Sequence, residues 1–384
     1  MLYSRVPYSP PPWLAGAVNP RLVPTSRLVL GRFPTPVHPF RVPHQMEREE
    51  METGVEFWIK RDDLSSFDLS GNKVRKLEFL LDEALEKGHD SVVTIGGVQS
   101  NHCRATAVAA RQLGLDPYLI LRTRNAVMDD ESILNTSVAG NLLFNRMVDA
   151  EIRTVTAATY ATVGSSRLLS QLTEELVSQG RKPYPIPVGG STPLGAFGYL
   201  EAIDEICRQQ QDSDISNFDH ICFSCGSGGT AAGLAIGAKL AGLKAKVHAV
   251  GVCDSPAYFY DHIRETAAAL GVDMDEGANG PVEDWLTVHH GSGAGYARST
   301  PEELEFMLLV ARTSGIILDP VYSGKALYFF LRDVVPQNPD LFQRGHKVLF
   351  IHTGGVLGMY DKAAELAPLL PPGRVTPMAV QRAP

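Results

Sequence analysis

Short apolar runs alternate with segments of helical periodicity along most of this chain of 384 residues. Strand–helix alternation of this kind is typical of a parallel α/β sheet, so it restricts the fold more than any other feature. The runs predicted as strands are Val55–Lys60, Ser91–Ile95, Tyr118–Leu121, Ile152–Val155, His220–Ser224, Lys246–Val252 and Lys347–His352. The segments predicted as helices are Asn72–Lys87, Asn101–Leu113, Asn135–Arg146, Ser166–Gly180, Ala196–Gln211, Thr230–Ala241, Pro301–Thr313, Lys325–Val334 and one after the last strand.

A stretch rich in proline and glycine around Pro183 separates two groups of these elements. Such a stretch is typical of a crossing between lobes. The part before it holds three or four strand–helix units, enough for a small sheet of its own. We therefore predict two open parallel-sheet α/β/α domains, a small one over 78–187 and a large one formed by 1–77 and 188–384.

Charge, hydropathy and cysteine content narrow the class of protein. The formal net charge of −8 and the scattered basic residues argue against a nucleic-acid partner. No apolar run reaches the ~20 residues that span a bilayer, so no membrane association is expected. Five cysteines without a regular spacing fit a reducing compartment, and Cys222 and Cys225 are interpreted as the end of a buried strand.

The N-terminal region, Met1–Pro43, is rich in proline and lacks the apolar core of a secretory signal. We interpret it as an extended arm that wraps on the body of a cytoplasmic protein. Its arginines and scarce acidic residues leave an organelle presequence as the alternative.

The run Ser70-Gly71-Asn72-Lys73-Val74-Arg75-Lys76 delivers a lysine to the first turn of a predicted amphipathic helix. Helix N–H groups and the neighbouring basic residues make that end locally positive. A positive field favours the free amine of Lys73, which makes it a better nucleophile toward an aldehyde. An aldehyde that carries a phosphate would bind well at such a helix start, a description that pyridoxal phosphate meets.

Two further motifs follow predicted strands, where an open α/β sheet lines its ligand crevice. Gly96-Gly97-Val98-Gln99-Ser100-Asn101-His102 supplies polar donors that suit a carboxylate, although Ser100 and Asn101 also suit an N-cap. Ser224-Cys225-Gly226-Ser227-Gly228-Gly229-Thr230 lets backbone N–H groups converge on a phosphate. Its spacing departs from a dinucleotide fingerprint, so a monophosphate is favoured.

Three later positions also suit a ligand site. Tyr322 begins a helix and could lie against a planar cofactor ring, Thr353 follows a strand, and Tyr296 lies in a glycine-rich loop. No HExxH motif, paired histidines or Cys/His cluster is present, so no catalytic metal is predicted. The adjacent pair His289-His290 would point to opposite sides of a regular element.

Together these segments resemble the D-cysteine desulfhydrase and 1-aminocyclopropane-1-carboxylate (ACC) deaminase family of fold-type II, tryptophan synthase β-like enzymes, which use pyridoxal phosphate. The resemblance extends from Phe33-Pro34-Thr35-Pro36 to His352-Thr353-Gly354-Gly355. Its most specific part is Ser70–Glu78 together with Gln99-Ser100-Asn101-His102. The glycine-rich loop with Ala297 after the tyrosine departs from the bacterial pattern and is similar to plant and algal members.

The resemblance implies a role for each motif. Lys73 binds the cofactor covalently, Tyr322 and Tyr296 flank its ring, and Thr353 meets its pyridine nitrogen. The implied catalytic residues are Lys73, Ser100, Tyr296 and Tyr322. The implied cofactor contacts are Lys73, Lys76, Asn101, Gly226, Ser227, Gly228, Gly229, Thr230, Tyr322 and Thr353. The implied substrate contacts are Gln99, Ser100, Asn101, His102 and Ser323.

The family divides at two positions. ACC deaminases have Glu after the tyrosine that matches Tyr322 and Leu in place of Thr353, whereas this chain has Ser323 and Thr353. A carboxylate near the pyridine nitrogen keeps it protonated and strengthens the ring as an electron sink. Opening a cyclopropane needs that strength more than expelling a thiolate does. The resemblance therefore implies α,β-elimination of D-cysteine to pyruvate, hydrogen sulfide and ammonia, by a homodimer.

Three alternatives remain open at this stage. The nearest is ACC deaminase, giving 2-oxobutyrate and ammonia, alone or as a second activity. Another is dehydration of L-serine or L-threonine on the same fold. The third is a regulatory protein that binds a nucleotide through Gly226–Gly229 without chemistry, and it would be colourless.

Overall fold

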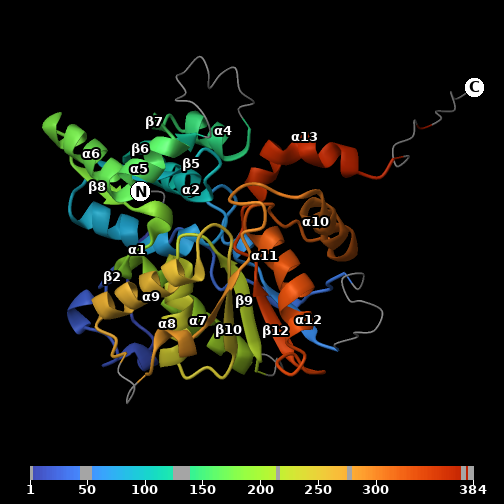
Figure 1. Ribbon diagram of the computed structural model, residues 1–384. Coiled ribbons are helices and arrows are strands. Elements are labelled where there is room, and N and C mark those ends of the chain that lie inside the picture. The colour runs from blue at the N-terminus through green and yellow to red at the C-terminus, as the bar shows by residue number, and fades with distance from the viewer. Residues whose placement is uncertain are drawn as a thin grey trace, which may run out of the picture.

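The computed structural model describes residues 3–43, 54–123, 139–212, 217–274, 279–372 and 378. In these ranges the strands form a six-stranded sheet, a four-stranded sheet and a two-stranded ribbon (Figure 1). The two larger sheets are flanked by helices, which confirms the predicted α/β class. None of the helices in these ranges is both long and apolar enough to cross a membrane.

The large sheet has the strand order β11-β10-β9-β12-β4-β3. All its neighbours are parallel except β3, which pairs antiparallel with β4 at one edge. Its strands are β3 (Val37–Pro39), β4 (Glu56–Lys60), β9 (His220–Cys225), β10 (Lys246–Gly251), β11 (Thr287–His290) and β12 (Lys347–Ile351). Both Cys222 and Cys225 lie buried in β9 as free thiols, as the sequence indicated.

The small sheet has the order β7-β6-β5-β8 and is parallel throughout. Its strands are β5 (Ser91–Gly97), β6 (Asp116–Thr123), β7 (Glu151–Thr156) and β8 (Pro183–Ile186). The proline-rich stretch predicted as a crossing therefore contributes the edge strand β8, because an edge position tolerates proline. All four strands fall within 78–187, although the exact domain boundaries stay a prediction.

The helices follow the predicted pattern with a few differences. They are α1 (Lys73–Glu86), α2 (Asn101–Gln112), α4 (Gly140–Met147), α5 (Ala157–Val163), α6 (Ser165–Ser178), α7 (Pro193–Asp212), α8 (Gly229–Leu240), α9 (Pro256–Leu270), α10 (Pro301–Ser314), α11 (Ser323–Phe329), α12 (Val335–Gln337) and α13 (Ala363–Leu366). The sequence pattern missed α5, α9 and the short β11. The first residues of the helix predicted over 135–146 lie outside the described ranges.

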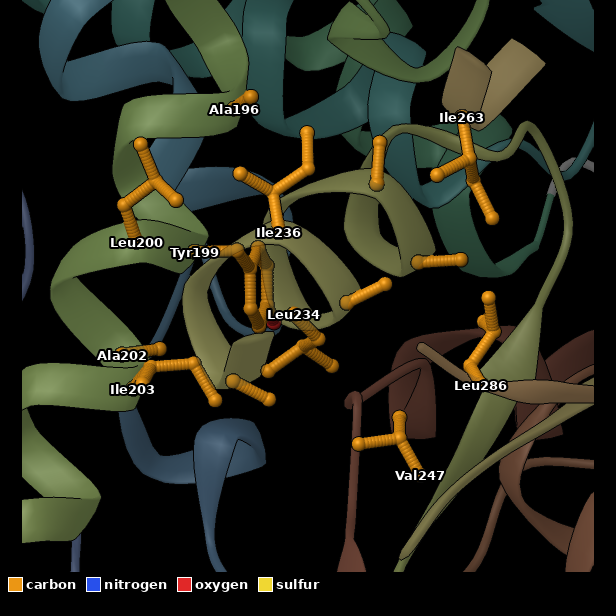
Figure 2. Packing of buried hydrophobic residues seen from close by; sticks show 14 of the residues in the cluster. Ala196, Tyr199, Leu200, Ala202, Ile203, Leu234, Ile236, Val247, Ile263 and Leu286 are labelled. Atoms are coloured by element: carbon orange, nitrogen blue, oxygen red, sulfur yellow. The ribbon is translucent and has the colours of Figure 1, made fainter. Parts of the chain in front are cut away.

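The largest buried cluster packs α7 and α8 against the large sheet (Figure 2). The two helices approach closely because α8 carries glycines on the shared face. A side chain at Gly233 would collide with Tyr199, and one at Gly237 would lie 2.8 Å from Ile203. This packing holds α8, and with it the helix start that follows β9.

The N-terminal arm is folded onto the body, as predicted. Its ribbon pairs β1 (Arg5–Pro7) with β2 (Ser26–Leu28). The Tyr8 hydroxyl donates to Glu201 (2.9 Å) and the Trp13 indole donates to Asp204 (3.2 Å), both on α7. The arm thus covers the outer face of α7.

Three imidazoles form a hydrogen-bonded chain on one face of the large sheet. A carbonyl only accepts, so His220 Nε2 donates to Leu341 O (3.1 Å) and its Nδ1 accepts from His248 Nε2 (3.1 Å). His248 Nδ1 in turn accepts from His289 Nε2 (3.0 Å). Each ring supplies one proton, so an added proton on His248 would place two N–H groups face to face.

The three hydrogen-bonded histidines predict that the fold loses stability in acid. Burial lowers the pKa of His220 to about 4, of His248 to about 3 and of His289 to about 4. A histidine with a depressed folded pKa stabilises the fold above the unfolded pKa and loses that contribution as pH falls. Each adds a slope of up to about 1.4 kcal/mol per pH unit to the free energy of unfolding below pH ~6.5.

Urea titrations between pH 7 and pH 4.5 check this expectation. The H248Q variant should lose less stability over that range than the parent protein, because its side chain does not ionise. H290Q, at the exposed neighbour of His289, serves as the matched control and should keep the parent slope. Identical slopes for the parent protein and H248Q would contradict the prediction.

Candidate active site

A pocket of about 370 Å³ lies where the carboxyl ends of β9 and β12 face the start of α2. Eight of the predicted site residues line it, together with three that the sequence reasoning did not single out. The predicted ones are Lys73, Asn101, Gly226, Ser227, Gly228, Thr230, Tyr322 and Thr353. The additional ones are Asn72, Ser224 and Cys225, each within a predicted motif but without a predicted role.

Lys73 is the first residue of α1 and lies at the edge of this pocket. Asn72 anchors the turn before it, since its amide donates to Thr230 Oγ1 (3.1 Å) and its N–H donates to Thr353 O (3.0 Å). Surrounding protein atoms lower the pKa of Lys73 to about 8 by desolvation. A large share of the amine is therefore neutral near pH 8, as a nucleophile requires.

The predicted cause of this shift was wrong, because burial and not a positive field lowers the pKa of Lys73. The Arg75 guanidinium points away from the pocket and is paired with Asp62 (2.8 Å) and Glu205 (2.9 Å). Neighbours in sequence on a helix face different directions, so a run of basic residues does not share one environment.

The glycine loop after β9 is shaped to accept a phosphate. Gly228 has a positive φ of 88°, which allows the turn into α8. A side chain at Gly226 would lie 2.9 Å from the Tyr322 ring, and one at Gly229 would lie 2.6 Å from Ser191 Oγ. Only backbone fits here, so the N–H groups at the start of α8 face the pocket directly.

Ser191 is a supporting residue that the sequence reasoning missed. Its hydroxyl donates to Ser227 Oγ (2.8 Å) and accepts from Gly229 N–H (3.1 Å). It follows Gly189 and Gly190, both of positive φ, and this Gly-Gly-Ser run was the signal available in the sequence. Ser191 therefore fastens the glycine loop from behind.

Lys76 lies next to this loop and donates to Gly189 O (3.1 Å). Burial, and then the charge of Lys73, lower its pKa well below the usual value. A bound phosphate would supply the negative charge that this buried amine lacks. The glycine cradle, Thr230 and Lys76 together fit the phosphate of pyridoxal phosphate, with Lys73 close enough to the same pocket to meet its aldehyde.

The polar run after β5 divides between the pocket and the scaffold. Asn101 lines the pocket, and its Oδ1 accepts from Asn141 Nδ2 (2.9 Å). The Gln99 side chain is directed to other partners: it donates to Ala139 O (3.0 Å) and Asp361 (3.2 Å) and accepts from the Asn141 N–H. In this structure Gln99 therefore secures the loop around Asn101, and its contact with substrate stays a prediction.

Ser100 and His102 also have structural partners. Ser100 caps α2, because its Oγ accepts from Cys103 N–H (3.2 Å). His102 is buried and donates from Nε2 to Thr94 Oγ1 (2.8 Å), which itself donates to Ile186 O. Neither lines the pocket described above. Their predicted contacts with the substrate carboxylate remain untested.

A chain of hydroxyl groups continues from the pocket-lining Ser224 and Thr353 to Ser323. Thr353 Oγ1 lies 2.9 Å from Ser224 Oγ and 3.3 Å from Ser323 Oγ. His352 donates from Nε2 to Ile317 O (3.0 Å), so its Nδ1 accepts from Ser323 Oγ (3.1 Å). Ser323 thus reaches the pocket only through Thr353, and the position carries no negative charge.

Two tyrosines meet at the mouth of the site. The hydroxyls of Tyr322 and Tyr296 lie 3.0 Å apart, and their rings meet edge to face. Asp319 accepts from the N–H groups of Tyr322 (2.9 Å) and Ser323 (2.7 Å), which fixes the start of α11. Burial raises the pKa of both phenols, so both are protonated at neutral pH.

Among the described residues, no group of His, Cys, Asp and Glu side chains could hold a metal ion.

Comparison with known proteins agrees with this geometry. A family model described as pyridoxal-phosphate dependent enzyme matches residues 29–354. The bifunctional D-cysteine desulfhydrase/1-aminocyclopropane-1-carboxylate deaminase, mitochondrial, of Arabidopsis thaliana is 46% identical, over 96% of this chain and 86% of that protein. The D-cysteine desulfhydrase of Serratia proteamaculans is 35% identical, over 80% of this chain and 88% of that protein.

A solved structure shows the same likeness in three dimensions. The crystal structure of an ACC deaminase homologue superimposes with a TM-score of 0.72 and 34% identity, covering 93% of this chain and 98% of the other. The sequence relatives, the family model and the solved structure agree on the family. The chain belongs to the D-cysteine desulfhydrase/ACC deaminase family of pyridoxal-phosphate dependent enzymes.

Proposed function

We propose that this enzyme eliminates the thiol group of D-cysteine, producing pyruvate, hydrogen sulfide and ammonia. The observation that carries the proposal is that the side-chain hydrogen-bond partners of Thr353 are hydroxyl groups. Its partners are the hydroxyls of Ser224 and Ser323, and Ser323 in turn contacts His352 Nδ1. The desulfhydrase activity in the names of two relatives supports the same choice.

Pyridoxal phosphate, when bound through Lys73, withdraws electrons from the Cα of an amino acid and so acidifies its Cα–H bond. The start of α8 would hold the cofactor phosphate, and Tyr322 would contact the pyridine ring. Thr353 offers a hydroxyl in place of a carboxylate, so a ring bound here would be a weaker electron sink than in a site that contains Glu. A thiol group leaves readily enough for this to suffice.

We assign removal of the Cα proton to Lys73. It lines the pocket, and desolvation brings its pKa to about 8, so the free amine can accept a proton near neutral pH. The hydrogen-bonded tyrosine pair supplies a second group for proton transfer at the mouth of the pocket. We assign the substrate carboxylate to the helix start at Ser100 and Asn101.

A substrate panel tests the proposal. Purified enzyme is expected to be yellow and to release sulfide and pyruvate in equal amounts from D-cysteine. L-cysteine, L-serine, L-threonine and ACC serve as comparisons, with keto acid measured for each. A higher kcat/KM for any of these than for D-cysteine would overturn the assignment.

A matched pair of double variants tests the role of the hydroxyl chain. S323E/T353L is expected to lower kcat/KM for D-cysteine and to raise 2-oxobutyrate formation from ACC, at least tenfold in the ratio of the two activities, because it introduces a carboxylate beneath the ring. S323A/T353V removes the same hydroxyls without adding a charge and should not gain activity on ACC. Equal ratios in all three proteins would show that these positions do not select the reaction.

ACC deamination is the second candidate, since the Arabidopsis relative is named for both activities and the superimposed structure is an ACC deaminase homologue. In the same panel it appears as 2-oxobutyrate from ACC. We also infer a homodimer, an expectation that follows from the family. A cytoplasmic location stays a prediction, and the name of the Arabidopsis relative assigns that protein to mitochondria.

A further inference from the structure

Arg122 lies near the end of β6, beside the strand that leads to the active site. In the parallel register of the small sheet it is paired with Gly97, the last residue of β5. Its guanidinium carbon lies 5.0 Å from the centre of the Tyr160 ring and 5.2 Å from that of Tyr296. The side chain therefore contacts one aromatic ring from α5 and one from the loop that follows β11.

No carboxylate pairs with Arg122 among the residues that the structure describes, and its side chain is partly buried. This distinguishes it from Arg75, whose charge two carboxylates neutralise. A guanidinium over an aromatic face is attracted to the ring electrons, and partial desolvation strengthens the attraction. Its charge also stays available to act on nearby groups.

Tyr296 is the group on which that charge acts. Its ring reaches across to the small sheet, where a side chain at Gly97 would lie 3.5 Å from it, and its hydroxyl lies 3.0 Å from that of Tyr322. The titratable groups around Tyr296 are Tyr322, Arg122, Cys253 and Cys103. Of these four, only Arg122 is charged at neutral pH.

Two effects on this phenol oppose each other. Burial raises the pKa of Tyr296, while its hydrogen bond with Tyr322 and then the charge of Arg122 lower it. The same two groups would stabilise a tyrosinate if Tyr296 gave up its proton during the reaction. An interaction that strengthens as charge develops accelerates the chemical step.

We propose that Arg122 is a positioning residue for the elimination: it holds the Tyr296 ring at the mouth of the site and stabilises the tyrosinate that forms when Tyr296 protonates the departing sulfur. The inference rests on the proposed function. Neither the lysine motif nor the glycine loop of the sequence pointed to this residue.

The proton balance of the step is as follows. Lys73 takes the Cα proton, and the electron pair of that bond ends as the Cα–Cβ double bond. The C–S bond breaks and its electron pair leaves with sulfur as HS⁻. Tyr296 transfers its hydroxyl proton to that sulfur, so H₂S departs and a tyrosinate remains beside Arg122. The proton held by Lys73 then restores Tyr296.

The choice of leaving group tests this assignment. Chloride needs no proton to depart, so β-chloro-D-alanine bypasses Tyr296, whereas D-cysteine requires it. The R122M variant, which keeps much of the side-chain volume without the charge, is expected to lose at least about tenfold in kcat on D-cysteine, within the range of general acid catalysis. Its kcat on β-chloro-D-alanine should stay within about twofold of the parent value, and its KM for D-cysteine should change little.

Two further variants separate charge from packing. R122K keeps the charge and should recover part of the D-cysteine rate. Y160F keeps the second aromatic ring and should behave as the parent enzyme on both substrates. Equal losses on both substrates in R122M, or an unchanged ratio in both R122M and R122K, would overturn the inference.

A readout without turnover accompanies the kinetics. The tyrosines are labelled with 13C at Cζ, and their NMR chemical shifts are followed against pH. The Tyr296 resonance is identified as the one that Y296F removes. It should titrate at higher pH in R122M than in the parent holoenzyme. An unchanged titration would also overturn the inference. R122Q, which likewise lacks the charge, provides the same comparison if R122M does not fold. A parent enzyme that releases pyruvate from β-chloro-D-alanine but not from D-cysteine would instead refute the proposed function.

Discussion

Replacing Lys73 with alanine is expected to abolish covalent cofactor binding and to lower kcat on D-cysteine by at least about 10²–10⁴-fold, the contribution of a general base alone. The reason is its place in the structure: it is the lysine that lines the pocket, and its pKa of about 8 leaves a neutral amine available. The purified variant should be colourless after dialysis, and sulfide release measures the loss of turnover.

Two controls accompany K73A. K73R keeps a cation at the start of α1 but forms no stable link with an aldehyde, so it should be as inactive as K73A while it retains the parent melting temperature. K87A changes an exposed lysine just after the same helix and should leave activity intact. Yellow colour and turnover in dialysed K73A would refute the role of Lys73.

Replacing Arg75 with methionine is expected to destabilise the fold by about 3–5 kcal/mol, the usual cost of leaving a buried charge unpaired. Arg75 is 3% exposed and contributes hydrogen bonds to Asp62, Glu205 and Thr35. Burial alone would raise the pKa of Asp62, but Arg75 and then Lys60 outweigh it and hold that pKa at about 2. Without Arg75, two carboxylates would face a single cation.

Urea unfolding at pH 7 measures this effect. R111M, at a half-exposed arginine on α2 that pairs with Asp116 on the surface, is the matched control and should cost at most about 1 kcal/mol. Because the cluster joins the residues after β4 to α1 and α7, R75M should also weaken cofactor binding through α1. A loss below about 1 kcal/mol in R75M would show that the surroundings accommodate the unpaired acids.

The ion cluster also shows where reasoning from local sequence stops. The run Lys73-Val74-Arg75-Lys76 was interpreted as one positive region, yet the three basic side chains have three environments. Lys73 lines the pocket, Lys76 contacts the glycine loop, and Arg75 is neutralised on the other side of α1 by acids from two other elements. A contact with Glu205, 130 residues away, leaves no trace in the local pattern.

The elements themselves were largely predictable, because periodicity and glycine placement are local properties. Strands β5, β9 and β12 and helices α1, α2 and α8 lie close to their predicted positions, and motifs at strand ends had to meet at one edge of a parallel sheet. The short β11 and the proline-rich β8 were not predicted from the sequence, since each is a brief edge strand whose pairing depends on its neighbour.

The sequence by itself therefore determined the α/β class, the lysine and the glycine cradle, all of which depend on residues adjacent in the chain. Only the tertiary structure decided which polar residues face the pocket and which support it. In it Gln99 and His102 hydrogen-bond to other parts of the protein, and Ser323 contacts Thr353. Arg122 lies over the ring of Tyr296. These relations arise from the packing of segments distant in sequence, and the direction of a side chain follows from that packing.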